Sequence, residues 1–123
     1  LKERGVRIAL VTSTVRPQVE EYFRCMPDVG AVFDAKICGG EVPNGKPAPD
    51  MFLAAVKALD LPASECVGVE DSFSGVNAIH ASGAFCVMIP DLLPFSDRFA
   101  PFVDECLPSL RELCPLIDRL NAR

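Results

Sequence analysis

The chain has no long apolar run, no basic cluster and only one histidine, and each absence disfavours a class of protein. Its 123 residues contain no apolar stretch close to the roughly 20 residues that cross a membrane. Its net charge is −5, and its lysines and arginines do not gather into the basic stripe that nucleic acids require. We therefore expect no membrane partner and no nucleic-acid partner.

Zinc sites and disulfide frameworks are also disfavoured. Six cysteines are present, but none forms a C-x-x-C pair, and His80 is not at metal-ligand spacing from any of them. Cys38, Cys66 and Cys86 fall within apolar runs, where a free thiol behaves as a small apolar side chain. This pattern favours reduced thiols in the core of a cytoplasmic protein.

Short apolar runs alternate with segments of helical periodicity along the chain. The apolar runs predict strands at Val6–Val11, Ala35–Cys38, Cys66–Val69 and Ala84–Ile89, with a weaker one near Phe102–Cys106. Helices are predicted from about Pro17, from Pro49-Asp50, from Ser74 to Gly83, and from about Ser109. The unbroken apolarity of the runs predicts strands buried on both faces. We expect one α/β domain over residues 1–123, a doubly wound (Rossmann-like) parallel sheet in three α/β/α layers.

Two adjacent carboxylates, Glu70 and Asp71, give the strongest chemical signal in the sequence. They follow the apolar run Cys66–Val69 directly, so they are expected at the end of a buried strand. Like charges that are removed from water repel each other, and a nearby cation relieves the repulsion. Mg²⁺ takes oxygen ligands of this kind, so the pair predicts a magnesium site.

Hydroxyls and a lysine add to this signal. Thr12, Ser13 and Thr14 follow another apolar run, and Lys46 lies in the turn Asn44-Gly45-Lys46-Pro47. Taken singly, the hydroxyls are more ordinary as helix caps and the lysine as a solvated charge. In parallel sheets, however, ligands bind at the carboxyl ends of strands. Together these residues outline a phosphate site.

Three stretches of the chain resemble the second, third and fourth motifs of the haloacid dehalogenase (HAD) superfamily. They are RIALVTST, GKPAPDMF and VGVEDSFSGVNAIHASG, and they are most similar to those of the beta-phosphoglucomutase and phosphoglycolate phosphatase branch. The resemblance implies that Thr12 and the backbone N–H of Ser13 bind the phosphoryl group. It also implies that Lys46 pairs with the nucleophile and the phosphate, and that Glu70 and Asp71 hold Mg²⁺.

The activity implied by this resemblance is that of a Mg²⁺-dependent phosphatase or phosphomutase. Such an enzyme acts on a small phosphorylated metabolite, such as a sugar phosphate, through an aspartyl-phosphate. Thr14 and Arg16 are further candidates for contact with the substrate, although a solvated arginine at a helix start is the more ordinary role.

The family's first motif, D-x-D-G-[TS], has no counterpart here, because none of the aspartates begins a D-x-D. The resemblance implies that this motif's strand lies centrally, between the strand of Thr12 and the strand of Glu70. It also implies that the cap domain is absent. The chain begins at Leu1 with no secretory signal pattern after it. We therefore expect a partial HAD-like core whose missing strand comes from an amino-terminal segment of the same enzyme, and no activity from these residues alone.

Three other functions share part of this pattern. The dehalogenase branch is disfavoured, because paired carboxylates for a metal are needed only for phosphoryl chemistry. A non-catalytic HAD-like binding or regulatory module stays open as the alternative. Receiver domains of response regulators are excluded by order, since their acidic pair comes first and their lysine last.

Overall fold

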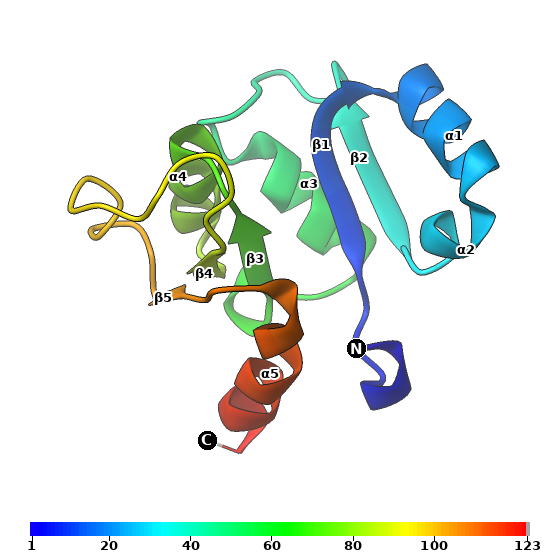
Figure 1. The fold of residues 1–123 in the computed structure, drawn as a ribbon. Coiled ribbons are helices and arrows are strands. Elements are labelled where there is room, and N and C mark those ends of the chain that lie inside the picture. Colours follow the sequence, from blue (N-terminus) through cyan, green and yellow to red (C-terminus); the bar gives the residue numbers. More distant parts are fainter. Residues whose placement is uncertain (123) are drawn as a thin grey trace.

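All strands pair in parallel, and they form two separate sheets rather than one (Figure 1). The computed structural model describes residues 1–122. The first sheet contains β1 (Ala9–Val15) and β2 (Ala35–Gly39), and the second contains β3 (Val67–Glu70), β4 (Phe85–Met88) and β5 (Glu105–Cys106) in that order. Among these residues β1 pairs only with β2, and β3 pairs only with β4. The edges of β1 and β3 are therefore unpaired in this part of the chain.

Helices connect the strands up to β4, as the alternation in the sequence predicted, and an irregular segment connects β4 to β5. The helices are α1 (Arg16–Cys25), α2 (Pro27–Gly30), α3 (Asp50–Ala58), α4 (Phe73–Ser82) and α5 (Leu113–Asn121), with 3₁₀ turns η1 (Lys2–Arg4), η2 (Ala63–Glu65) and η3 (Leu110–Glu112). Pro17 stands in the first turn of α1, where its missing N–H costs no helical hydrogen bond. Gly83, at φ 87°, ends α4 in the left-handed conformation that glycine adopts readily. The α/β fold with parallel strands is confirmed.

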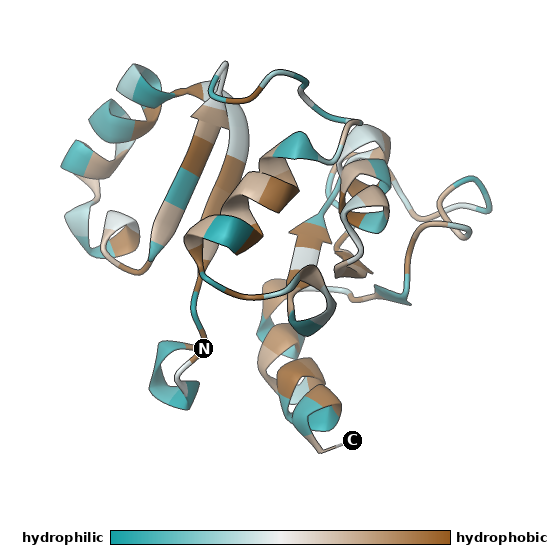
Figure 2. Ribbon diagram, turned by 180° about the vertical axis from the view of Figure 1, so that it is seen from behind, coloured by the Kyte–Doolittle hydropathy of each residue, from teal (hydrophilic) through white to brown (hydrophobic). Residues whose placement is uncertain are grey.

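One apolar core joins the two sheets on the face that α3 covers (Figure 2). Phe52 of α3 packs with Val76 and Ile79 of α4 and with Met88 of β4, and Val11 of β1 lies against the same cluster. A second cluster on the other side of β4 joins Val87 to α5. Burial of these side chains from water is the main force that holds the two sheets in one fold.

The strands differ in burial, which corrects the expectation that all of them are covered on both faces. In β4 the side chains of Cys86, Val87 and Met88 are fully buried, whereas β1 and β3 are at most partly buried. The side chains of Cys86 and Met88 pack in one apolar cluster and that of Val87 in the other, so both faces of β4 are covered. β4 has a strand on each side, while β1 and β3 each have a neighbour on one side only within residues 1–122.

Other sequence expectations need correction at element boundaries. β1 begins at Ala9 rather than Val6 and continues through the three hydroxyl residues instead of ending before them. Ser72, not Ser74, caps α4, because its hydroxyl accepts a hydrogen bond from the Gly75 N–H at 3.1 Å. The strand predicted near Phe102–Cys106 shortens to two residues. The short helix α2 was not predicted from the sequence.

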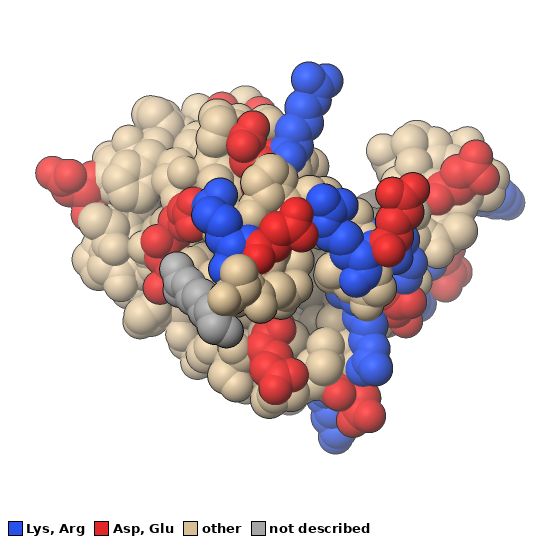
Figure 3. Space-filling model, turned by 90° about the horizontal axis from the view of Figure 1, so that it is seen from below, with Lys and Arg blue, Asp and Glu red and all other residues tan. Residues whose placement is uncertain are grey.

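The amino terminus and the helix α5 lie at the end of the molecule opposite the carboxyl ends of β1 and β3 (Figure 1). The 3₁₀ turn at the amino end forms exposed ion pairs, Lys2 with Asp34 at 2.9 Å and Arg4 with Asp118 at 3.0 Å. Figure 3 looks at this end and shows basic and acidic side chains interspersed. In residues 1–122 no helix has the length and apolarity that a membrane crossing needs.

Candidate functional site

Lys46 and Glu70 form an ion pair at the carboxyl end of β3. Nζ of Lys46, in the loop between β2 and α3, donates to Oε1 of Glu70, and each side chain is only 11% exposed. Lys46 therefore supplies a positive charge to one member of the acidic pair, Glu70. Removing either partner would leave an uncompensated charge in a nearly dry position.

The loop that carries Lys46 is fixed at both sides of the lysine. Asp50, the first residue of α3, accepts hydrogen bonds from the backbone N–H of Asn44 at 3.1 Å and from its side-chain amide at 3.2 Å. Nζ of Lys46 also lies 5.4 Å from the centre of the Phe52 ring, within range of a cation–π interaction. These contacts limit the positions that the ammonium group can take.

The other carboxylate oxygen of Glu70 faces the start of α4. Ser72 Oγ and the backbone N–H of Asp71 both donate to Oε2, each at 3.3 Å. Ser72 uses its hydroxyl twice, since it also accepts from the Gly75 N–H at 3.1 Å. The carboxylate is thus held by a lysine on one side and by a helix start on the other.

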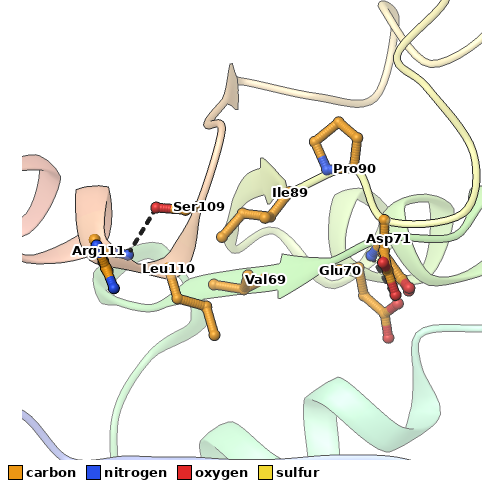
Figure 4. Close-up of a pocket in the computed structure, with 9 residues that line it drawn as sticks. Val69, Glu70, Asp71, Ile89, Pro90, Ser109, Leu110 and Arg111 are labelled. Atoms are coloured by element: carbon orange, nitrogen blue, oxygen red, sulfur yellow. Dashed lines mark hydrogen bonds between the residues drawn. The ribbon is translucent and has the colours of Figure 1, made fainter.

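Asp71 is exposed and lies beside an open hollow of about 630 Å³ (Figure 4). Glu70 and Asp71 border one end of the hollow, while Val69, Ile89 and Leu110 form an apolar part. Two carboxylates fit Mg²⁺, which commonly takes one or two of them together with water and phosphate oxygens. In residues 1–122 no group of three His, Cys, Asp or Glu side chains is placed to hold a metal, so Mg²⁺ here would need further oxygen ligands.

The three hydroxyl residues form an irregular segment of β1. β1 pairs Val11 with Ile37 and then Val15 with Gly39, so it uses more residues than β2 over the same length. Thr12 Oγ1 accepts from the Thr14 N–H at 3.1 Å, which stabilises the bulge. Ser13 and Thr14 are exposed. This conformation leaves polar groups of the segment open to a ligand.

Gly39 makes this bulge possible. A Cβ atom at this position would lie 2.8 Å from the backbone carbon of Ser13 and closer still to its carbonyl oxygen. Thr12 and Thr14 line a second hollow of about 380 Å³, together with residues of α1. β1 and β3 run in the same direction (Figure 1). The hydroxyls of β1 and the acidic pair after β3 border different hollows.

Arg16 is engaged by a neighbouring carboxylate. Its Nε and one terminal nitrogen donate to the two Glu41 oxygens at 2.6 and 2.9 Å, and it also donates to the Lys36 carbonyl at 2.8 Å. These hydrogen bonds, with one from the Cys38 N–H, lower the pKa of Glu41 to about 2. A contact between Arg16 and a substrate stays a prediction, and it would require Arg16 to leave Glu41.

Several residues that shape the site were not singled out from the sequence as site residues. Nothing in the sequence marked Gly39 or Gly75 as a site residue, apart from their positions at the end of a predicted strand and near the start of a predicted helix. Glu41 acts through Arg16, 25 positions earlier, and Asp50 through Asn44, six positions earlier in an irregular loop. Ser72, a residue type common at helix caps, is the one whose role a local pattern could have indicated.

Comparisons with known proteins give the family. A family model described as haloacid dehalogenase-like hydrolase matches residues 1–83. CbbY of Cereibacter sphaeroides is 34% identical over 114 residues, 91% of this chain and 49% of CbbY. A phosphorylated carbohydrates phosphatase of Thermotoga maritima is 35% identical over 83 residues, 68% of this chain and 38% of the phosphatase. The crystal structure of CbbY from Rhodobacter sphaeroides in complex with phosphate has a TM-score of 0.76 and 31% identity, covering 91% of this chain and 50% of that one.

The chain therefore spans about half the length, or less, of these relatives. The matches extend over the sequence stretches on which the resemblance was based, and the solved structure shares the parallel α/β fold. The resemblance is confirmed, and the chain belongs to the haloacid dehalogenase-like hydrolases.

Proposed function

We propose that this chain carries the phosphate-binding and metal-binding residues of a Mg²⁺-dependent phosphatase or phosphomutase for a small phosphorylated metabolite. The observation that carries the proposal is the convergence of Lys46, Glu70 and Asp71 at the carboxyl end of β3. Relatives named as CbbY and as a phosphorylated carbohydrates phosphatase support this substrate class. A sugar phosphate is the ligand that we would test first.

The proposed roles follow from the chemistry of each side chain. Transfer of a phosphoryl group depends mainly on positioning and on neutralisation of its oxygens. The Lys46 ammonium, held in a nearly dry position, would neutralise charge on the phosphoryl group. The Thr12 hydroxyl and the Ser13 N–H would donate hydrogen bonds to the oxygens of that group. Glu70 and Asp71 would hold Mg²⁺, which supplies charge stabilisation at the phosphate oxygens when it is bound.

The nucleophile would come from polypeptide outside these 123 residues. The family resemblance implies an aspartate that accepts the phosphoryl group as an aspartyl-phosphate, on a strand between β1 and β3. The unpaired edges of β1 and β3 support this proposal, because backbone N–H and C=O groups favour pairing when they are withdrawn from water. The partial exposure of apolar residues in β1 and β3 supports it as well. The chain alone would then be inactive.

A complementation assay tests this function. We would measure hydrolysis of a generic aryl phosphate with Mg²⁺, first with the chain alone and then with an added or fused segment that carries a D-x-D-G-[TS] strand. We expect turnover only in the second case, and we expect it to disappear on addition of EDTA. The matched control is the same segment with its first aspartate replaced by asparagine. Turnover by the chain alone would contradict the proposed source of the nucleophile.

A non-catalytic module is the second candidate, and one observation favours it. The Lys46–Glu70 pair satisfies both charges without any ligand, as a purely structural pair would. If the complemented chain binds a sugar phosphate and shows no turnover with Mg²⁺, this second function is supported and the first is contradicted.

A further inference from the structure

We propose that Gly75 is a positioning residue for Glu70. The missing side chain at position 75 leaves the space into which Glu70 folds, and this space aims the carboxylate at Lys46. As far as Glu70 is a metal ligand, the inference rests on the proposed function. The positioning itself concerns two groups of this chain and can be tested without a metal.

The Glu70 side chain occupies the space next to Gly75. Gly75 is buried in the first turn of α4. A Cβ atom built on it would lie 2.6 Å from Glu70 Cγ and closer still to Cδ and Oε2. The three nearest atoms all belong to the Glu70 side chain, so it is this glutamate that a side chain at position 75 would meet.

The backbone gives no other reason for glycine at this position. Gly75 is inside a regular α-helix, and its φ is not in the positive range that favours glycine. Glycine is among the least favourable residues in a helix, and alanine is the most favourable. Helix stability alone would therefore select against glycine here, while the Glu70 contact selects for it.

A neighbouring glycine of the same interface shows the contrast. A Cβ atom on Gly68 of β3 would meet the branched side chain of Ile79, with Cγ2 at 2.6 Å and Cγ1 at 2.7 Å. Ile79 is a fully buried core residue, so this clash would strain the packing between β3 and α4. Glu70, by contrast, meets position 75 with the flexible end of its side chain. A side chain there would displace the carboxylate and leave the core in place.

Displacement of Glu70 would release Lys46. The carboxylate is now held by Lys46 on one oxygen and by Ser72 and the Asp71 N–H on the other. A methyl group at position 75 would push the carboxylate away from the helix start. Lys46 would then lose its partner and become available to reagents in solution.

Acetylation of Lys46 in the metal-free chain measures this release. We would compare the rate with that of Lys57, an exposed lysine of α3, by mass spectrometry in Gly75→Ala, Gly68→Ala and the unchanged protein. Gly75→Ala is expected to raise the relative rate for Lys46 several-fold and to lower the melting temperature, because the Lys46–Glu70 pair is broken. Gly68→Ala is expected to lower the melting temperature and leave that rate unchanged. An unchanged rate in Gly75→Ala would overturn the proposal.

A double variant tests the coupling. Glu70→Asp shortens the side chain by one methylene, so its carboxylate no longer reaches over position 75. Adding Gly75→Ala to Glu70→Asp should therefore change the Lys46 rate no further, which is the non-additivity of a direct contact. If Gly75→Ala fails to fold and the double variant folds, the clash with Glu70 is supported. If neither folds, or if the two effects add, α4 itself rejects the side chain and the proposal is wrong.

Mn²⁺ binding separates this inference from the proposed function. The protein is expected to bind Mn²⁺, and Gly75→Ala is expected to bind it several-fold more weakly than Gly68→Ala does. If the unchanged protein binds no Mn²⁺ while the acetylation pattern holds, the metal role of Glu70 fails and the positioning by Gly75 stands. Weaker Mn²⁺ binding with an unchanged Lys46 rate contradicts the displacement of Glu70.

Discussion

The two sheets hold polar groups at their strand ends by different means. At the end of β1 the backbone does so, since the bulge at Thr12–Thr14 exposes polar groups and Gly39 packs against the Ser13 backbone. At the end of β3 side chains do so, since Glu70 is held by Lys46 and folds over Gly75. The bulge at the end of β1 depends only on how β1 pairs with β2. The ion pair at the end of β3 depends on Lys46, which lies in the loop after β2, so this pair connects the first sheet to the second.

The largest expected effect concerns the ion pair between Lys46 and Glu70. Lys46→Ala leaves the Glu70 carboxylate without its cation, and breaking a buried pair in this way is expected to lower the free energy of unfolding by about 3 kcal/mol. Urea denaturation measures the loss. In a complemented, active enzyme the same variant is expected to lower kcat by a factor of roughly 100 or more, because a fixed charge near the phosphate is lost.

Two controls sharpen this prediction. Lys57→Ala removes an exposed lysine of α3 and should leave both quantities almost unchanged. Lys46→Met combined with Glu70→Gln removes both charges, so most of the stability should return while activity stays lost. Equal stability losses in Lys46→Ala and in this double variant would show that packing, rather than the unpaired charge, is responsible.

Gly39→Ala tests the bulge of β1 and its close contact with β2. The added Cβ meets Ser13 backbone atoms, which cannot rotate away, so the bulge or the β1–β2 pairing must move. We expect a loss of about 2 kcal/mol in the free energy of unfolding, within the usual range for overpacking. Gly45→Ala is the matched control, because a Cβ there has open space around it. A loss of equal size in both variants would contradict the close approach of β2 to the bulge.

The fold was predictable where the signal is local. The apolar run Ala35–Cys38 became β2 almost residue for residue, and Gly83 ends its helix as its place in the sequence indicated. Burial was not predictable in the same way, because it depends on which strands are neighbours. Both β3 and β4 were predicted as buried strands from their apolar runs, yet only β4 has a strand on each side within residues 1–122.

The candidate site was predictable as residue types and not as contacts. Lys46, Glu70 and Asp71 were singled out from motifs, but the direct ion pair between Lys46 and Glu70 required the loop after β2 to fold back over β3. Arg16 was interpreted as a solvated arginine at a helix start, whereas in the structure it donates hydrogen bonds to Glu41. Such partners are set by tertiary packing, which leaves no periodic pattern in a single sequence.

A smaller effect compares the cores of the two sheets. Val87 of β4 is fully buried, so Val87→Ala is expected to lower the free energy of unfolding by about 2 kcal/mol, including the cavity that it leaves. Val11 of β1 is partly buried, and Val11→Ala should cost about 1 kcal/mol or less. Urea denaturation of both variants measures the difference. If a strand added between β1 and β3 covers Val11, the cost of Val11→Ala should rise in the complemented protein, and an unchanged cost would contradict that placement.

The smallest expected effect is the response of the first sheet to acid. The Arg16 guanidinium and the Cys38 N–H lower the pKa of Glu41 from its ordinary 4.5 to about 2. A carboxyl group whose pKa is lowered by folding stabilises the fold above its unfolded pKa, and this contribution is lost as the pH falls from 4.5 toward 2. Lys2 and Arg4 lower the pKa values of Asp34 and Asp118 in the same direction. Arg16→Gln should therefore lose less stability than the unchanged protein when urea midpoints are compared across this pH range, with Lys57→Gln as the control. Parallel losses in Arg16→Gln and Lys57→Gln would contradict a contribution of the Arg16–Glu41 pair to the acid sensitivity of the fold.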